Sequence, residues 1–420
     1  MENQEINHKE KAILVGVIHG NIDETTAHEH LDELELLSET AGANIVGRIT
    51  QRLNRLNPQY LVGKGKADQI VGQAKELGAD LIIFDDDLSP GQIKNFMNLA
   101  ENIKVIDRSA LILDIFRQHA RSREAKTQVE LAHLEYLLPR LTKQWSHLER
   151  QMGGVGTRAG MGETQIEIDR RLIRTRISKL KKELQKIENE RTTQSKGRQN
   201  YFRAALVGYT NAGKSTLMNA LSGADVYIKD QLFATLDTTI RQVDINDSQP
   251  ILLSDTVGFV RKLPHNLVAS FRSTLKEVVE SDLLLIVLDA SSMQVKDHMN
   301  TIYEVLKEIG SGDKRQLTIL NKIDLVENEQ TFIQLKNYFP DAILVSALNQ
   351  LRLDELLNSV KKMINEGYKT VELEIPYSEG KTISEIQNDM DVLDKHYTEQ
   401  GVRITFKGPL GKVQKIIQQL

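Results

Sequence analysis

The sequence predicts an α/β protein of several domains, and three observations support this fold class. Short apolar runs alternate with amphipathic stretches between Ala12 and Leu113, a pattern typical of parallel strands joined by helices. A strand, a glycine-rich loop and a helix are expected in succession between Ala204 and Ser215. The chain has 420 residues, whereas single hydrophobic cores rarely organise more than ~250–300 residues. We therefore expect more than one core.

Four domains follow from the order of these patterns. Residues 1–113 are expected to form a small α/β domain, with strands at residues 12–18, 44–49, 81–84 and 104–106. Residues 114–200 are expected to form a long antiparallel helical hairpin. We expect residues 201–367 to form an α/β domain with a mostly parallel sheet flanked by helices, and residues 368–420 to add a small α/β domain at the C-terminal end.

Composition excludes several classes of protein. With 40% hydrophobic and 27% charged residues, the chain has the composition of an ordinary globular protein. It has no Cys, which excludes disulfides and Cys-ligated metals. The longest apolar run, Leu283 to Leu288, is far shorter than the ~20 residues of a membrane span. The segment from Met1 to Lys11 lacks the apolar centre of a secretory signal, so we expect a cytoplasmic protein.

The hairpin is predicted by apolar residues at alternating four- and three-residue spacings. They lie at Leu131, Leu134, Leu138, Leu141, Trp145, Leu148 and Met152, and the pattern resumes from Ile173 to Ile187. The glycine-rich segment from Gly153 to Gly162 is expected to be the tip between the two helices. Pro139 is expected to bend the first helix, because it removes one backbone hydrogen bond.

Charge is distributed unevenly along the chain. The formal total is −4, but residues 117–200 hold 19 Lys and Arg against 10 Asp and Glu. This excess suggests an anionic partner such as RNA, although basic helices are also often solvated faces. The candidate RNA contacts are Arg158 at the tip and a patch formed by Arg170, Arg171, Arg174 and Arg176.

A phosphate-binding loop is predicted between the strand Ala204 to Val207 and the following helix. The loop reads Gly208-Tyr209-Thr210-Asn211-Ala212-Gly213-Lys214-Ser215. Backbone N–H groups of such a loop bind phosphate oxygens, its Lys reaches the β- and γ-phosphates, and its Ser hydroxyl ligates Mg²⁺.

Three further motifs follow in the expected order, and each comes directly after an apolar run. Asp255 is expected to hold the Mg²⁺ shell and Gly258 to meet the γ-phosphate. A buried carboxylate at Asp324 is expected to accept two hydrogen bonds from guanine, which adenine cannot donate. The backbone of the third motif can reach the guanine O6. The motifs are Ser254-Asp255-Thr256-Val257-Gly258, Asn321-Lys322-Ile323-Asp324 and Ser346-Ala347-Leu348; together they predict a GTP-binding and GTP-hydrolysing domain.

The first switch is expected at Phe233-Ala234-Thr235-Leu236-Asp237-Thr238-Thr239. Thr235 is the preferred second Mg²⁺ ligand, with Thr238 and Thr239 as alternatives, because the ligand requires only a hydroxyl. The predicted catalytic residues are Lys214, Thr235 and Gly258, and the predicted metal ligands are Ser215 and Thr235.

The residue after Gly258 is Phe259, and its side chain cannot orient water. We therefore expect slow hydrolysis by the isolated protein, with either an external partner or K⁺ at Asn211 as the activator.

Two motifs in the N-terminal domain have simpler interpretations. The turn Gly63-Lys64-Gly65-Lys66 could bind phosphate, with a plain tight turn as the alternative. The acidic run Asp85, Asp86 and Asp87 is expected to be a loop and helix cap rather than a metal site.

Over roughly its whole length the chain resembles the HflX family of ribosome-associated GTPases. The resemblance rests on Asp255 to Phe259 and on four further segments: Tyr60 to Lys66, Thr127 to Ala132, the tip Gly153 to Glu163, and Phe233 to Asp237. One position departs from the family pattern, because this chain has Thr238 where the family usually has Pro.

The resemblance implies a monomeric GTPase that binds the large ribosomal subunit and its rRNA. It also implies that the ribosome stimulates hydrolysis and that stalled ribosomes are split. Two alternatives stay open from sequence: a large-subunit assembly factor, and a Ras-like switch that acts on a protein partner.

Overall fold

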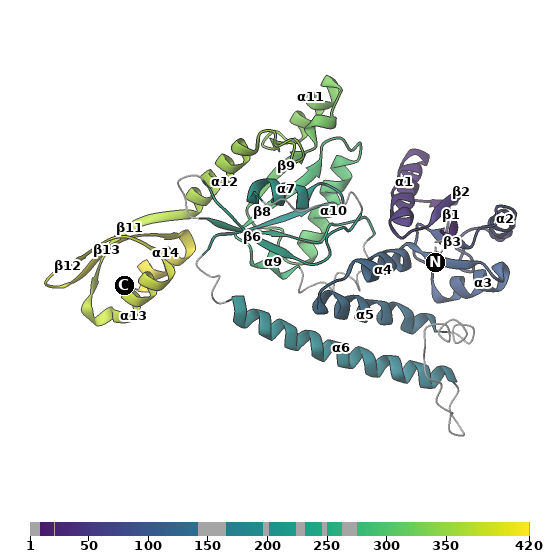
Figure 1. Cartoon of the computed structure of the whole chain (residues 1–420), viewed down its shortest axis with the longest axis horizontal. Coiled ribbons are helices and arrows are strands. Elements are labelled where there is room, and N and C mark those ends of the chain that lie inside the picture. The colour runs from purple at the N-terminus through teal and green to yellow at the C-terminus, as the bar shows by residue number, and fades with distance from the viewer. Residues whose placement is uncertain are drawn as a thin grey trace, which may run out of the picture. The chain divides into compact units, whose positions relative to one another are not determined.

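The computed structural model describes residues 9–20, 22–141, 165–195, 201–223, 232–245, 250–262 and 275–419. By their contacts these residues form two units, whose elements are labelled in Figure 1. The first unit contains the chain up to Glu188, together with the described part of Lys229–Asp237 and with Lys262. The remaining described residues form the second unit.

The first unit contains the parallel sheet that the sequence predicts. Its strands are β1 (Lys11–Ile18), β2 (Asn44–Arg52), β3 (Leu81–Phe84) and β4 (Lys104–Asp107), in the order β2-β1-β3-β4. The connecting helices are α1 (Glu24–Thr40), α2 (Lys64–Glu76) and α3 (Pro90–Ala100), and α4 (Arg108–His119) follows β4. Every residue of β3 is buried, as expected for a strand in a parallel sheet that is covered on both faces.

Side-chain caps set where several of these helices begin. Asp23 accepts a hydrogen bond from Thr26 N at the start of α1, and Asp107 accepts one from Ala110 N at the start of α4. Ser89 forms a capping box with Gln92 before α3. Each cap satisfies a backbone N–H that has no partner within its helix.

The helical arm consists of α5 (Arg123–Leu137), the 3-10 helix η1 (Leu138–Arg140) and α6 (Gln165–Ser195). Two ion pairs show that α5 and α6 run antiparallel: Glu130 pairs with Arg176, and Arg123 pairs with Glu183 further toward the end of α6. The expectation of a bent helix continuing through Pro139 is wrong. The α-helix ends at Leu137 and tightens into η1, where Pro139 donates no backbone hydrogen bond, and Leu141 is already extended.

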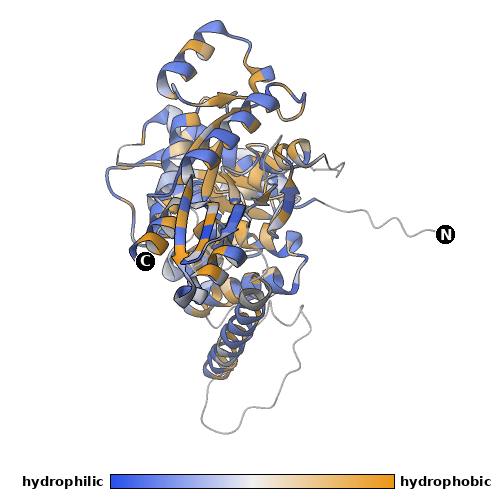
Figure 2. Cartoon of the chain, turned by 90° about the vertical axis from the view of Figure 1, so that its left-hand side faces the viewer, coloured by the Kyte–Doolittle hydropathy of each residue, from blue (hydrophilic) through white to orange (hydrophobic). Residues whose placement is uncertain are grey.

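The described residues of the predicted apolar seam of the arm are buried or half-buried. Leu131 of α5 and Ile173 and Leu180 of α6 are at most 8% exposed, whereas most of α6 is hydrophilic, as the blue helix at the bottom of Figure 2 shows. Trp145, the glycine-rich tip and Arg158 lie outside the described residues.

The second unit contains a six-stranded sheet in the order β10-β9-β8-β5-β7-β6. The strands are β5 (Arg203–Gly208), β6 (Thr239–Val243), β7 (Ile251–Asp255), β8 (Leu283–Asp289), β9 (Gln316–Asn321) and β10 (Ile343–Leu344). All neighbouring strands are parallel except β6, which runs antiparallel to β7. The helices of this sheet are α7 (Lys214–Ser222), α9 (Lys276–Glu280), α10 (Val295–Glu308), α11 (Glu329–Tyr338) and α12 (Leu353–Gly367), with the 3-10 helix η5 at Ile323–Leu325.

The C-terminal part folds around its own core. Strands β11 (Tyr368–Pro376), β12 (Asp391–Tyr397) and β13 (Gly401–Pro409) form an antiparallel sheet in the order β11-β13-β12. The 3-10 helix η6 (Tyr377–Glu379) and the helices α13 (Gly380–Asp389) and α14 (Leu410–Gln419) complete it. Its buried residues include Ile375, Ile404 and Phe406. Within the part of the chain that the structure describes, no helix is both long and apolar enough to span a membrane.

Candidate functional site

The predicted phosphate loop connects β5 to α7, and its backbone conformation depends on glycine. Gly213 has φ of 87°, and a Cβ there would lie 2.3 Å from Asn321 Nδ2. A Cβ on Gly208 would lie 2.3 Å from the carbonyl oxygen of Val287 on the neighbouring strand. Asn211 also has a positive φ, of 59°. A side chain at Gly208 would displace the loop from the sheet, and one at Gly213 would strain the backbone and displace the Asn321 amide.

Lys214 begins α7 and its side chain folds back over the loop. Its Nζ donates hydrogen bonds to the carbonyl oxygens of Gly208 at 3.1 Å and Tyr209 at 2.9 Å. Burial lowers the pKa of Lys214 to about 8, although the Asp255 carboxylate acts in the opposite direction. A buried ammonium among carbonyl oxygens would be stabilised further by the negative charge of a phosphate.

The two residues expected to organise a metal ion are adjacent. Ser215 Oγ donates a hydrogen bond of 2.5 Å to Asp255 Oδ2 at the end of β7. Hydroxyl and carboxylate oxygens are the ligand types that Mg²⁺ prefers. These side chains therefore fit a Mg²⁺ ion whose other ligands come from phosphate oxygens and water. The described residues hold no cluster of three or more His, Cys, Asp or Glu side chains suited to a metal.

The segment after β7 lies directly against the phosphate loop. Thr210 N donates to the Phe259 carbonyl oxygen at 2.7 Å, and Phe259 N donates to the Gly208 carbonyl oxygen at 3.0 Å. A Cβ on Gly258 would lie 2.6 Å from Thr210 Cα and 3.0 Å from Lys214 Nζ. The structure thus brings Gly258 beside the predicted phosphate-binding lysine, as expected. Thr256 is fully buried, with its hydroxyl bonded to Leu206 O, and Val257 is also buried.

Asn321 connects the phosphate loop to the third predicted motif. Its Nδ2 donates to the Ala212 carbonyl oxygen at 3.0 Å, and its Oδ1 accepts from Ala347 N at 2.9 Å. Lys322 has φ of 62° and forms an ion pair of 2.8 Å with Asp289. The Asn321 amide therefore joins the phosphate loop to the loop that contains Ala347, at the carboxyl ends of the strands.

The expectation that the Asp324 carboxylate is buried is wrong. Asp324 is exposed, because it lies in η5 beyond the end of β9, where the chain has left the sheet. In the neighbouring loop Ser346 and Ala347 are buried, whereas Leu348 is 78% exposed. The first two residues of this motif are thus packed into the domain, whereas the Leu348 side chain is not.

The predicted first switch is divided between the units, because its residues up to Asp237 group with the first unit and Thr238 and Thr239 with the second. Phe233 has φ of 55° and is 2% exposed, and its ring packs edge-to-face on Phe116 of α4 with the centroids 4.7 Å apart. The Asp237 carboxylate accepts hydrogen bonds from the backbone N–H groups of Arg121 and Ser122 and from the Ser122 hydroxyl. Ser122 is the N-cap of α5. Leu236 is buried, Thr235 is half-buried and Ala234 is exposed.

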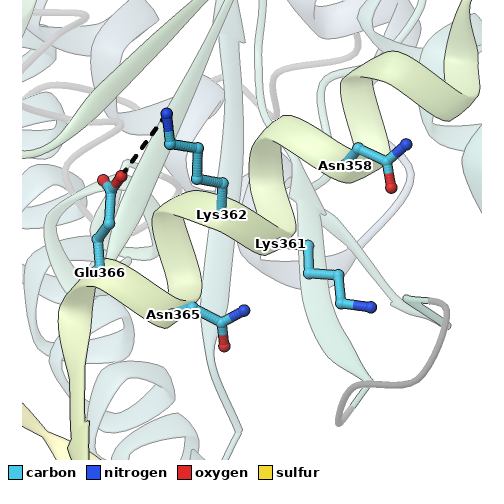
Figure 3. Close-up of a pocket in the computed structure, with 5 residues that line it drawn as sticks. All are labelled: Asn358, Lys361, Lys362, Asn365 and Glu366. Carbon is cyan, nitrogen blue, oxygen red and sulfur yellow. Dashed lines mark ion pairs between the residues drawn. The ribbon is translucent and has the colours of Figure 1, made fainter.

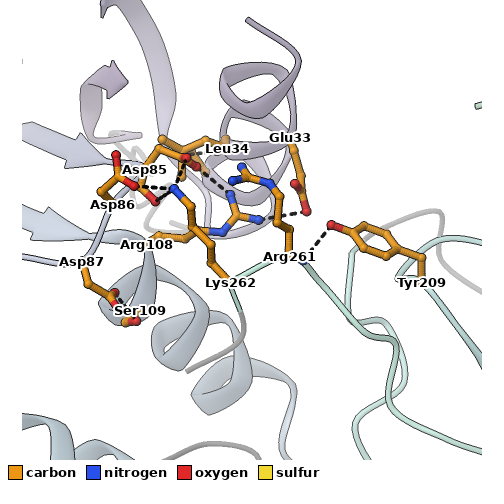
Figure 4. A network of polar contacts seen from close by, with 11 residues as sticks. Glu33, Leu34, Asp85, Asp86, Asp87, Arg108, Ser109, Tyr209, Arg261 and Lys262 are labelled. Carbon is orange, nitrogen blue, oxygen red and sulfur yellow. Dashed lines mark hydrogen bonds and ion pairs between the residues drawn. The ribbon is translucent and has the colours of Figure 1, made fainter. Parts of the chain in front are cut away.

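The acidic run in the first unit has a role that sequence reasoning missed. Asp85 is 3% exposed, and its carboxylate bonds to Arg108 at 2.9 Å and to Lys262 Nζ at 2.9 Å (Figure 4). Lys262 also pairs with Asp86. The run does not cap α3, because Ser89 does. No local pattern indicates this pairing, because Lys262 lies far along the chain from Asp85.

The predicted arginine patch on α6 is partly used inside the arm. Arg176 makes two hydrogen bonds to Glu130, and Arg170 donates to the Leu141 carbonyl oxygen at 3.2 Å. Arg171 and Arg174 are exposed. At the Gly63-Lys64-Gly65-Lys66 turn, Gly63 precedes α2 and its N–H donates to Gln51 Oε1.

One described cavity, of about 510 Å³, lies along α12 and includes none of the predicted site residues. It is lined by Asn358, Lys361, Lys362, Asn365 and Glu366 (Figure 3). All five come from one helix. The arrangement of Gly258, Lys214 and Ser215 is therefore the stronger candidate site.

Comparison with known families gives three consecutive matches. They are GTP-binding GTPase N-terminal at residues 28–117, GTP-binding GTPase Middle Region at residues 119–198, and 50S ribosome-binding GTPase at residues 203–322.

Curated relatives match over nearly the whole chain. GTPase HflX of Flavobacterium psychrophilum is 44% identical, covering 88% of this chain and 94% of its own. GTPase HflX of Escherichia coli K12 is 40% identical, covering 98% of this chain and 96% of its own. Among solved structures, a GTP-binding protein from Sulfolobus solfataricus in complex with GDP is 26% identical, with a TM-score of 0.44 over 84% of this chain and 98% of that one.

Proposed function

Because the chain belongs to the HflX family of GTPases and is a GTP-hydrolysing enzyme, we propose that its GTP form binds the large ribosomal subunit in the cytoplasm and splits stalled ribosomes. The proposal has two parts, a nucleotide site in the second unit and a ribosome-binding arm in the first. Each part is supported by different residues.

In the nucleotide site, the loop from Gly208 to Gly213 binds the phosphates through its backbone N–H groups and the positive end of α7. Lys214 places its ammonium at the β- and γ-phosphates, and the Gly258 N–H meets the γ-phosphate. Ser215 is the proposed Mg²⁺ ligand in this unit, with Asp255 orienting the ion's water shell, and Thr235 remains the predicted second ligand. The ion would neutralise the charge that develops on the phosphates during hydrolysis.

The base site is formed by the two loops that Asn321 joins. Asp324 is exposed, which leaves its carboxylate accessible to the N1–H and N2–H groups of guanine. The Ala347 N–H is bonded to Asn321, so this loop is positioned by the same side chain that contacts the phosphate loop. Lys322 and Leu348 flank the site and are proposed to contact the base.

Hydrolysis by the protein alone is proposed to be slow. Phe259 is 2% exposed, and its side chain has no atom that could orient a water molecule. The ribosome is proposed to complete the site by ordering the switches. Asn211, whose backbone φ is 59°, is the proposed ligand of an activating K⁺.

The observation that carries the ribosomal proposal is the bond between the first switch and the arm. Asp237 of the predicted switch accepts hydrogen bonds from the backbone N–H groups of Arg121 and Ser122, which directly precede α5. The arm that starts there carries the excess of Lys and Arg, 19 against 10 Asp and Glu over residues 117–200. A conformational change in the switch would therefore alter the contacts at the start of α5. The arm that begins there is basic and suited to rRNA phosphates.

Gradient sedimentation of whole ribosomes tests this proposal. With a non-hydrolysable GTP analogue we expect the protein to travel with the large subunit and the ratio of free subunits to whole ribosomes to rise. With GDP the protein should stay at the top. The matched control deletes Gly153 to Gly162, which should retain GTP hydrolysis but lose ribosome stimulation. If the protein stays at the top of the gradient at low salt in both nucleotide states, the ribosomal proposal is wrong.

If the protein binds only immature large subunits and leaves whole ribosomes intact, the splitting role is replaced by one in assembly. Binding that is insensitive to salt would instead favour a protein partner, because phosphate contacts make affinity fall steeply with salt concentration.

A further inference from the structure

The second residue of the phosphate loop has a structural role that the motif does not require. The loop pattern accepts any residue after its first glycine, yet Tyr209 is only 6% exposed. A buried tyrosine ring must pack against neighbouring side chains, and its hydroxyl must find a hydrogen-bond partner within the domain.

Two contacts fix the Tyr209 side chain. Its hydroxyl oxygen accepts a hydrogen bond of 2.7 Å from the backbone N–H of Arg261 (Figure 4). Its ring stacks on the imidazole of His298 in α10, with the centroids 3.9 Å apart and the planes 15° from parallel. The stack sets the direction of the phenol, so the hydroxyl is held where Arg261 N can reach it.

The hydroxyl bond extends a backbone ladder between the loop and the segment that follows β7. Residues 208 and 210 exchange backbone hydrogen bonds with Phe259, and the Tyr209 hydroxyl then binds the segment two residues further on. All of these residues belong to the second unit. Together the three bonds fix the path of the chain on the C-terminal side of Gly258.

We propose that Tyr209 is a positioning residue for GTP hydrolysis, which holds Arg261 through its hydroxyl so that the Gly258 N–H is aligned with the γ-phosphate. Because Phe259 offers no polar side-chain atom, this segment can act on the phosphate only through its backbone. Accurate placement of that backbone therefore sets the rate. The inference rests on the proposed nucleotide site.

Tyr209→Phe tests the inference, because it removes the hydroxyl and keeps the ring. In the full-length protein we expect kcat for GTP to fall about fivefold, the effect of one hydrogen bond, while GDP affinity stays within about twofold of wild type. His298→Ala should lower kcat in the same direction by loosening the stack, and His298→Phe should recover much of the loss. Tyr303→Phe on the same helix, where the side chain is 42% exposed, is the matched control and should be silent.

Three results would overturn the inference. An unchanged kcat in Tyr209→Phe would show that the hydroxyl does not position the switch. Equal losses in kcat and GDP affinity, with a lower melting temperature, would show that it only stabilises the loop. Failure of the wild-type protein to bind GDP would reject the nucleotide site itself, and GDP titration of the wild type distinguishes that case from the other two.

Discussion

The phosphate loop and the first-switch segment are held in place by different kinds of contact. The loop depends on backbone geometry, because Gly208 and Gly213 approach Val287 and Asn321 more closely than a Cβ would allow. The switch segment depends on side-chain contacts of Phe233 and Asp237 with α4 and with the residues before α5. Phe233 packs on Phe116, and Asp237 binds the residues that begin α5.

This difference shows which part of the site is fixed and which can respond. Backbone contacts between neighbouring strands persist as long as the sheet does. Single side-chain contacts of the kind made by Asp237 contribute only about 1 kcal/mol each, so we propose that they form and break with the nucleotide state. The second such anchor is Lys262, which pairs with Asp85 and Asp86 in the first unit.

The largest effect is expected from Asp85→Ala. The substitution removes one of the carboxylates that pair with Arg108, which is fully buried. Breaking a buried ion pair lowers the free energy of unfolding by about 3 kcal/mol. Hydrogen exchange of β3 and β4 should report the destabilisation. Asp68→Ala on α2 is the control, because Asp68 is exposed and should change stability by less than about 0.5 kcal/mol. Equal effects of the two substitutions would mean that the Asp85 network does not hold this region.

An intermediate effect is expected from pH at the phosphate loop. Burial lowers the pKa of Lys214 to about 8, and bound phosphate should raise that pKa by favouring the charged form. Nucleotide binding therefore takes up a proton once the pH exceeds the pKa of the free site. GDP affinity should fall about sevenfold between pH 7 and 8.8.

Calorimetry in buffers of different ionisation enthalpy can count that proton. No proton uptake and an unchanged affinity over this range would show that Lys214 is not the phosphate-binding cation. The same lysine makes the fold less stable below pH 8, and this cost should be relieved as pH rises from about 8 toward the unfolded value near 10.5.

The smallest effect is expected from Asp237→Ala. Removing the carboxylate leaves the N–H groups of Arg121 and Ser122 without this acceptor, at a cost of about 1 kcal/mol. Amide exchange at these two positions should speed up about fivefold, while amides in the middle of α4 stay unchanged. Asp237→Asn retains one oxygen acceptor and should have a smaller effect. Unaltered exchange at residues 121 and 122 would argue against a link between the switch and the arm.

Sequence reasoning succeeded where the signal was local. The N-terminal strands and the strand–loop–helix from β5 to α7 follow from apolar runs and glycine spacing, and the structure confirms them. Sequence reasoning was wrong where more than one local structure or partner was available to the same residues. Pro139 ends α5 instead of bending a longer helix, and the acidic run pairs with Arg108 and Lys262 instead of capping a helix.

By itself the sequence determined the fold class, the GTPase family and the order of the motifs, because strand periodicity and fixed glycine positions are properties of neighbouring residues. Only the tertiary structure decided that Asp237 binds the start of α5 and that the Tyr209 hydroxyl holds Arg261. These contacts join residues that are far apart in the chain, and their energies depend on burial and orientation. No local spacing encodes either quantity.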